Sequence, residues 1–378
     1  MKKTFALLLM VLSFLGVKAN DGVYYTSGNQ LIPITETEIS VKKEILDITR
    51  QNQQIMVHVY YEFFNPGNEK TLLVGFEALP PGGVWEMTEE EYKDLTDHPS
   101  IHDFTVTING QRLNYQVSHV EDKEGYFSNG KFNELSKKRE LELGQAMDFM
   151  EGIPYLFVYH FNATFKKGLN VVEHTYTFDE SVYVGAEYCF DYVLTAANRW
   201  ANKQIDDFTL NINMGDRESF GIRPEFFKSA DEWTINGVGR VSDGGDFYYD
   251  QMVFHMQKGG ITFHKKNFHP DGELVINKMD PGMMLMWGDK TGEDVMNAVK
   301  MQYTRWRTFI FEEGFTLTKE EKRILKNVPF AYRGHVFKDK GLKKFFESTN
   351  WYVPDPDYKD DMGTMTQEER EWIEFWAK

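Results

Sequence analysis

The sequence contains a single cysteine, Cys189, in 378 residues. A chain with one thiol cannot form an intrachain disulfide, so its fold must be held together by packing alone. Cys189 lies in the mostly apolar, β-prone segment VYVGAEYCFDYVL. A nucleophilic cysteine needs an electropositive, partly exposed environment. The sequence therefore predicts a buried and unreactive thiol.

Long apolar runs are also missing after the first 19 residues, and no later run approaches the roughly 20 residues that span a bilayer. The N-terminal segment MKKTFALLLMVLSFLGVKA combines a lysine pair with a short apolar run and ends on Ala19, the pattern of a secretory signal peptide. Because Asn20 follows and not a cysteine, we expect no lipid anchor. We predict that residues 1–19 are a signal peptide and that the protein is exported to the periplasm or the cell surface.

Positive charge is scarce, since 42 lysines and arginines face 58 aspartates and glutamates, for a net charge of −16. The predicted signal peptide carries three lysines, so its removal takes the net charge to −19. Electrostatic repulsion works against nucleic acid and anionic lipid as main partners. We therefore expect no nucleic-acid partner and no transmembrane segment, whereas the oligomeric state is left open.

Motifs of common enzyme classes are absent as well. There is no G-x-S-x-G elbow, no H-E-x-x-H zinc helix and no P-loop. The segment GVGRVSDG (237–244) fails the dinucleotide-binding pattern because Ser242 stands where the third glycine belongs, and we interpret it as a glycine-rich turn. We predict no catalytic residues and no cofactor. A pair of carboxylates for glycoside hydrolysis stays open, because its diagnostic feature is a distance.

Metal-ligand patterns are weak. His98 and His102 are separated by Pro99, and His264 and His269 have no third ligand nearby in the sequence. The acidic segment DPDYKDD (355–361) lacks the central glycine and the bidentate glutamate of an EF-hand. We therefore expect no metal site and interpret this segment as a solvated loop.

Alternation of period two dominates the chain as far as residue 278. In QIMVHVYYEFF the apolar residues from Ile55 to Phe63 occupy every second position, as in a half-buried strand. Asn109-Gly110 suits a two-residue hairpin turn. Short strands between turns predict a mainly β protein with an antiparallel β-sandwich region over residues 20–315, in two sandwich units. Residues 131–152 show a helical rhythm and predict a helical insertion or a connector.

The C-terminal residues 316–378 predict a small α-helical domain. Two capping boxes mark helix starts, one from Thr318 to Glu321 and one from Thr366 to Glu369. A further helix is expected where Val295 and Val299 share a face, and Gly334 is expected to end a helix, because a positive φ costs glycine little.

Within this region, FAYRGHVFKDKGLKKFFESTNWYVP (330–354) followed by MTQEEREWI resembles the YARHG domain, a presumed extracellular bacterial module. Aligned on Gly334, the sequence departs from the family pattern at Tyr332 and Arg333, where Arg and His are usual, and His335 occupies the aromatic position that follows. The resemblance implies an export context and no established chemistry. A domain of about 60 residues without disulfides needs large apolar side chains for its core, so most of its aromatic residues should be buried. A minority could form a binding face, and we predict it from Tyr332, Arg333, His335 and Tyr352.

The β region is similar to an uncharacterised family of secreted bacterial proteins, on the segments NDGVYYTSGNQLIPITETEISVKKEILDI and VHVYYEFFNPGNEKTLLVGFEALPP. Together these features predict an exported, non-enzymatic envelope protein that binds or scaffolds a cell-wall polymer, a glycan or an envelope protein. Two alternatives stay open. One is an envelope hydrolase with its site in the β region, and the other is a structural oligomerisation module.

Overall fold

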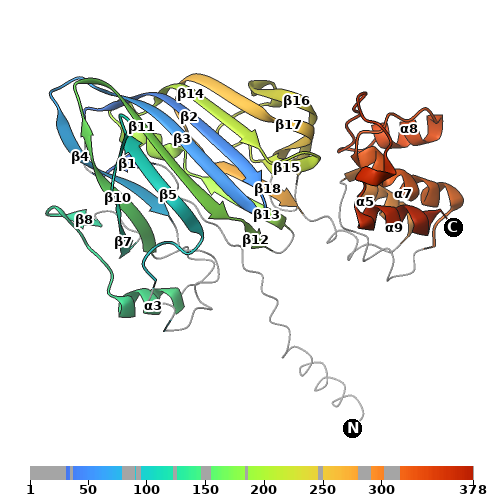
Figure 1. Ribbon diagram of the computed structural model, residues 1–378, viewed down its shortest axis with the longest axis horizontal. Helices are drawn as coiled ribbons and strands as arrows, with labels where there is room; N and C mark the ends of the chain where they lie inside the picture. Colours follow the sequence, from blue (N-terminus) through green and yellow to red (C-terminus); the bar gives the residue numbers. More distant parts are fainter. Residues whose placement is uncertain are drawn as a thin grey trace, which may run out of the picture.

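The computed structural model describes residues 31–34, 37–78, 90, 95–121, 126–145, 155–183, 186–245, 250–279, 291–301 and 316–377 (Figure 1). In this part of the chain the protein is mainly β, and most helices gather at the C-terminal end. The predicted fold class is therefore confirmed. The predicted signal peptide, residues 1–19, lies outside the described residues.

Most strands belong to one large sheet, which has 12 strands in the described part of the chain. Eleven of them follow the order β12-β13-β18-β15-β17-β14-β2-β3-β11-β5-β6. The twelfth, β16, pairs with β17. The pair β14–β2 is parallel, and the other neighbours are antiparallel. A single sheet thus runs through the region where we expected two sandwich units. Its strands are β2 (Ser40–Gln51), β3 (Gln54–Asn65), β5 (Ile101–Ile108), β6 (Gln111–Arg112), β11 (Gly168–Asp179), β12 (Ser181–Tyr183), β13 (Ala186–Tyr192), β14 (Ile205–Asn213), β15 (Glu218–Ile222), β16 (Trp233–Gly245), β17 (Asp250–Phe268) and β18 (Leu274–Met279).

A smaller antiparallel sheet packs against this large sheet. Its order is β1-β4-β10-β7, formed by β1 (Leu31–Pro33), β4 (Lys70–Ala78), β10 (Tyr155–Phe165) and β7 (Gln116–Glu121). Aromatic rings join the two layers: Phe76 lies 5.2 Å from Tyr176, and Tyr159 lies 5.0 Å from Phe104, between ring centroids. Side chains of both sheets form one apolar core, as in a β-sandwich.

The strand and hairpin predictions are confirmed in detail. In β3 the alternate residues from Ile55 to Phe63 are buried, so one face of the strand lies on the core. Asn109 and Gly110 connect β5 to β6 with φ of 52° and 78°, the left-handed pair that a type I′ turn requires.

The segment 131–152 contains both a strand and a helix. Strand β9 (Lys131–Phe132) pairs with β8 (Phe127–Ser128), and helix α3 (Lys137–Gln145) follows. Glu140 of α3 is fully buried, with its carboxylate 2.8 Å from Nδ1 of His119 on β7. The helix is therefore fixed to the small sheet, while residues 146–152 lie outside the described part of the chain.

The glycine-rich segment 237–244 is not a turn, contrary to our interpretation. It forms part of β16, which pairs with β17 in a long hairpin. The register shifts at a β-bulge between Val238 and Gly239. Bulges bend a strand and redirect the side chains beside them, here that of Arg240.

Close packing across the hairpin explains these glycines. A Cβ atom on Gly237 would lie 2.2 Å from the carbonyl oxygen of Lys258, and one on Gly239 would lie 2.6 Å from the sulfur of Met256. The turn interpretation was wrong because the glycines are needed for a close backbone approach and not for a chain reversal.

The C-terminal helices form a second apolar cluster of their own. They are α5 (Gly292–Met301), α7 (Lys319–Tyr332), α8 (Lys340–Glu347) and α9 (Gln367–Trp376). The helix predicted around Val295 and Val299 is confirmed as α5. Because α5 contributes buried residues to this cluster, the helical unit includes residues before position 316, where we placed the domain boundary.

Both predicted capping boxes are present. The hydroxyl of Thr318 accepts a hydrogen bond from the amide of Glu321, and that of Thr366 accepts one from the amide of Glu369, while each glutamate side chain accepts from the N-cap amide. Gly334 has a φ of 86° directly after α7, as expected for a residue that ends a helix.

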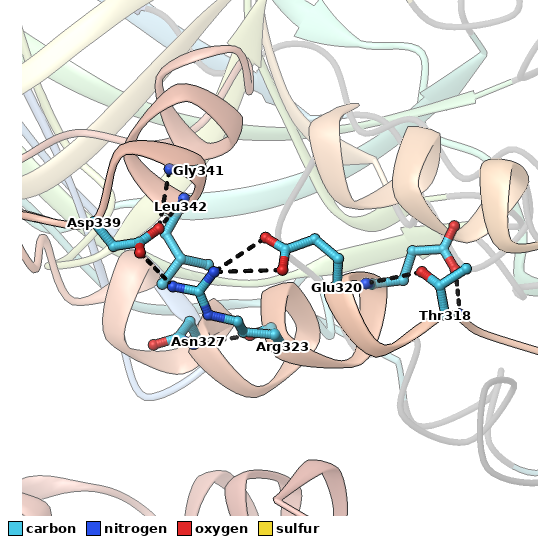
Figure 2. A network of polar contacts seen from close by, with 8 residues as sticks. Thr318, Glu320, Arg323, Asn327, Asp339, Gly341 and Leu342 are labelled. Atoms are coloured by element: carbon cyan, nitrogen blue, oxygen red, sulfur yellow. Dashed lines mark hydrogen bonds and ion pairs between the residues drawn. The ribbon is translucent and has the colours of Figure 1, made fainter.

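A surface network joins α7 to the start of α8 (Figure 2). Arg323 of α7 contacts Glu320 at 3.2 Å on its own helix and Asp339 at 2.6 Å. Asp339 is the N-cap of α8 and accepts from the amides of Gly341 and Leu342. No described helix has the length and apolar character needed to cross a bilayer.

Candidate functional site

Two of the predicted binding residues lie at the end of α7 and face different parts of the protein. The hydroxyl of Tyr332 donates to the main-chain carbonyl of Arg217 beside β15, and the Tyr332 carbonyl accepts from Gln257 of β17 at 2.8 Å. Arg333 is only 7% exposed and pairs with Glu369 of α9 at 2.6 Å. Tyr332 therefore contacts the β region, whereas Arg333 links two helices of its own domain.

The other two predicted residues lie together. The hydroxyl of Tyr352 donates to the carbonyl of His335 at 2.6 Å, and Nδ1 of His335 lies 2.7 Å from the carboxylate of Asp360. Tyr352 is 4% exposed, and burial raises its pKa to about 12. The structure thus brings His335 and Tyr352 together and directs Tyr332 and Arg333 elsewhere.

A cleft of about 430 Å³ lies between the β16–β17 hairpin and the helical domain. One wall is the bulged part of β16, residues 237–240, and the other is formed by Glu347 and residues 352–354. Gly237 and Gly239 line the first wall, and the space that a Cβ atom would need at each is already filled by atoms of β17. The cleft is open to solvent, so it suits part of an extended ligand better than an enclosed small molecule.

The two walls of this cleft carry opposite charges. Arg240 reaches across it, and its Nη2 donates to the carbonyl of Thr349 at 3.1 Å. Burial lowers the pKa of the Arg240 guanidinium. On the helical side, Glu347 is half exposed and its nearest charged partner is Lys343, at 3.7 Å on the same helix. A polar ligand with both acceptor and donor groups would fit this arrangement.

No pattern in the sequence marks Arg240 or Glu347 as site residues. Glu347 is one of 58 acidic residues, and Arg240 follows glycines that we interpreted as a turn. The useful signal was the alternation Gly237-Val238-Gly239 inside a β-prone segment, because glycine in a strand often marks a bulge or a close approach.

A much smaller cleft adjoins the first, behind Tyr332. At its base His255 of β17 is 2% exposed and bridges two hydroxyls, that of Ser219 at 2.8 Å from Nδ1 and that of Ser242 at 3.1 Å from Nε2. Burial lowers the pKa of His255 to about 3. Since hydroxyls occupy both ring nitrogens, no carboxylate orients the ring as in a hydrolytic triad. The space, about 10 Å³, is too small for a substrate.

Polar contacts hold the helical domain against the hairpin. Besides the bonds of Tyr332 and Arg240, Lys258 of β17 contacts Asp355 at 3.1 Å and Asp357 at 3.9 Å. The apolar clusters of the two domains are separate. Contacts of this kind weaken in salt, so the width of the cleft should depend on ionic conditions.

We predict that Lys258→Glu releases the helical domain from the hairpin. The substitution replaces an attraction with repulsion from two carboxylates, and small-angle X-ray scattering should show a larger radius of gyration at low salt. Lys265→Glu is the matched control, because Lys265 lies on the same strand and pairs with Glu232 inside the β region at 2.7 Å. An unchanged scattering profile for Lys258→Glu would contradict electrostatic docking.

Cys189 is buried, as predicted. Burial raises the pKa of its thiol, which donates to the Asp191 carboxylate with a sulfur–oxygen distance of 3.6 Å. Asp191 is also buried, and this raises its pKa to about 7. Neither residue lines the two clefts described above, so this pair belongs to the core and not to the site.

The histidines and the acidic loop have local partners. His102 lies 2.7 Å from Asp179, and His264 lies 2.8 Å from Asp207. In the acidic loop, Asp355 contacts Lys258 and Asp360 contacts His335. Among the described residues, no group of three or more histidine, cysteine, aspartate or glutamate side chains could hold a metal ion.

Each end of the chain matches the model of a known family. Residues 301–378 match the model of the YARHG domain. The predicted YARHG resemblance is confirmed. The match begins at residue 301, the last residue of α5, and therefore starts before the predicted domain boundary at residue 316. Residues 19–125 match a domain of unknown function (DUF4424), in agreement with the expected uncharacterised family at the N-terminus.

Comparisons beyond these domains show only distant similarity. A search of curated proteins finds no match. A Legionella pneumophila protein described as a proposed nutrient-binding protein is 19% identical, with a TM-score of 0.48 over 94% of this chain and 99% of that chain. Baculovirus P35 is 10% identical, with a TM-score of 0.25 over 64% of this chain and 98% of that chain. An M1 zinc metallopeptidase from Deinococcus radiodurans is 6% identical, with a TM-score of 0.23 over 64% of this chain and 42% of that chain.

Proposed function

We propose that this protein is an exported, non-catalytic binding protein of the cell envelope, and that it holds a segment of a wall polymer in the cleft between β16 and the YARHG domain. The observation that carries this proposal is the cleft of about 430 Å³, which is lined by Arg240 on one wall and by Glu347 on the other. Tyr352, one of the four residues predicted from the sequence, lies at its edge.

The chemistry of the cleft suits a polymer rich in hydroxyl and amide groups. Arg240 offers N–H donors on one wall, and Glu347 offers acceptors on the other. Such converging polar groups give a binding site its orientation and specificity. An open cleft also allows a long chain to pass through, which an enclosed pocket would prevent.

Peptidoglycan is the wall polymer we favour, because its strands carry hydroxyl, amide and carboxyl groups together. The hydrolase alternative receives less support. It requires two carboxylates at catalytic separation, whereas among the described residues Glu347 alone contributes a carboxylate to the larger cleft and none lines the smaller one.

The test is co-sedimentation of the full mature protein with isolated peptidoglycan sacculi. We expect the wild-type protein to pellet and Val238→Trp to stay in solution, because Val238 lines the cleft and an indole there would fill it. Point variants are preferable to removal of the YARHG domain, since truncation would expose the apolar face of α5.

Thr234→Trp serves as the matched control. Thr234 lies on β16 as well, is exposed, and does not line the cleft, so this variant should pellet like the wild type. Equal pelleting of both tryptophan variants would place the site elsewhere on the protein. If the wild-type protein does not pellet, the peptidoglycan proposal is wrong.

A further inference from the structure

Arg240 has no carboxylate partner among the described residues, unlike Arg50 and Arg333. Arg50 pairs with Glu180 at 2.6 Å, and Arg333 pairs with Glu369 at 2.6 Å. Among the described residues, no carboxylate lies within ion-pair distance of Arg240, whose guanidinium bonds the carbonyl of Thr349. A guanidinium has five N–H donors, so most of those on Arg240 are left for a group in the cleft.

The residues around Arg240 supply no negative charge either. Its cross-strand neighbour is His255, which burial keeps neutral. The wall beside it consists of glycine main chain and Val238. Glu347 lines the cleft, but it contacts Lys343 and not Arg240. A partly buried cation without a counter-charge is costly, and an anion that enters the cleft would remove this cost.

The bulge in β16 fixes where this cation lies. The register shift falls between Val238 and Gly239, immediately before Arg240. The bond to Thr349 then orients the guanidinium toward the YARHG side of the cleft. A planar guanidinium held in this way matches a carboxylate, which it can bind through two parallel hydrogen bonds.

We infer that Arg240 binds a carboxylate of the wall polymer, so that the cleft selects carboxylate-bearing segments over neutral ones. This inference rests on the proposed function and adds the chemical class of the ligand. Glu347, on the opposite wall, would accept hydrogen bonds from hydroxyl or amide groups of the same segment. The preferred ligand therefore combines one carboxylate with neutral donors a short distance away.

Chemical modification of the polymer tests this inference without changing the protein. Sacculi whose carboxyl groups have been converted to amides keep their glycan strands and lose their negative charges. We expect the wild-type protein to bind the amidated sacculi at least ~10-fold more weakly than native sacculi, as for the loss of a charge-assisted hydrogen bond. Equal binding to both preparations would overturn the carboxylate inference while leaving the proposed function intact. Failure to bind native sacculi would overturn both.

Arg240 variants complete the test. Arg240→Gln should bind native sacculi as weakly as the wild type binds amidated sacculi, and should not distinguish the two preparations. Arg240→Lys keeps the charge but not the planar fork, so it should bind native sacculi with intermediate strength. The scattering profile of each variant shows whether the YARHG domain is still docked. If the Arg240→Gln variant still prefers native sacculi while its YARHG domain is docked, another group binds the carboxylate and the inference is wrong.

Discussion

Arg333→Ala should destabilise the YARHG domain by about 3–5 kcal/mol, the range measured when one partner of a buried ion pair is removed. Arg333 and Glu369 are both nearly buried, and two contacts join them, Nη2–Oε2 at 2.6 Å and Nε–Oε1 at 3.1 Å. Removal of Arg333 leaves the Glu369 carboxylate buried without its cation. The same carboxylate accepts from the amide of Thr366 at 2.8 Å, so the start of α9 should loosen as well.

Hydrogen exchange followed by mass spectrometry can measure this loss within the domain, because amide protection reports local stability. Protection should fall in α7 and α9 and stay unchanged in the β sheets, since the two apolar cores are separate. The double variant Arg333→Met, Glu369→Gln should recover part of the protection, because it leaves no buried charge and glutamine can still complete the capping box.

Arg323→Ala is the matched control. Arg323 also lies on α7 and contacts two carboxylates, Glu320 and Asp339, but all three side chains are largely exposed (Figure 2). Exposed ion pairs contribute little to stability. Arg323→Ala should therefore lower the amide protection of α7 and α9 far less than Arg333→Ala does. If the two variants have equal effects, burial does not determine the strength of the Arg333–Glu369 pair.

Much of the fold was predictable because it depends on local patterns. The alternation in β3, the Asn109-Gly110 turn and the capping boxes at Thr318 and Thr366 each require only a few neighbouring residues. The cleft could not be predicted in this way. It joins residues 237–240 to residues 347–354, more than a hundred positions apart in the sequence, and its charge pattern exists only because the two domains dock.

The surroundings of the predicted binding residues also depend on contacts between residues far apart in the sequence. Tyr352 reaches the cleft and Tyr332 reaches the hairpin, but Arg333 is turned inward by an acid 36 residues later, Glu369. The sequence shows Glu369 plainly as a capping-box residue and gives no indication of its second partner. Family resemblance placed the YARHG domain correctly, yet the side that faces a ligand depends on the β hairpin against which the domain packs.

The β region should lose stability in mild acid, and His174 is one cause. This side chain is fully buried, and neither ring nitrogen has a hydrogen-bond partner among the described residues. Its ring lies 5.8 Å from those of Tyr61 and Phe76 and 6.1 Å from that of Tyr176. Burial, and to a lesser degree the neighbouring His58, lowers the pKa of His174 to about 3.

The sign of the effect follows from the number of protons bound in each state. An unfolded histidine takes up a proton near pH 6.5, whereas folded His174 and His255 do so only near pH 3. Below pH 6.5 the unfolded state therefore binds more protons, and each histidine lowers the free energy of unfolding by about 1.4 kcal/mol per pH unit. Asp191 acts in the opposite direction, because its folded pKa of about 7 lies above the unfolded value of 3.8. Asp191 offsets one of the two histidines, so these three groups together leave a net loss of about 1.4 kcal/mol per pH unit between pH 6.5 and 4. His160, whose pKa burial also lowers, acts in the same direction as His174.

His174→Phe should remove the share of this acid sensitivity that comes from His174. Phenylalanine keeps a ring in the aromatic cluster and cannot take up a proton, and the remaining contributions of His255 and Asp191 nearly cancel. Between pH 6.5 and 4.5 we expect the free energy of unfolding to fall by about 3 kcal/mol more in the wild type than in the variant. Urea unfolding at pH 6.5 and pH 4.5, monitored by hydrogen exchange of amides in the β region, measures this difference in the free energy of unfolding. His264→Gln, at an exposed position of the same sheet, should behave like the wild type. An equal acid loss in His174→Phe and the wild type would mean that the protons are taken up elsewhere in the β region.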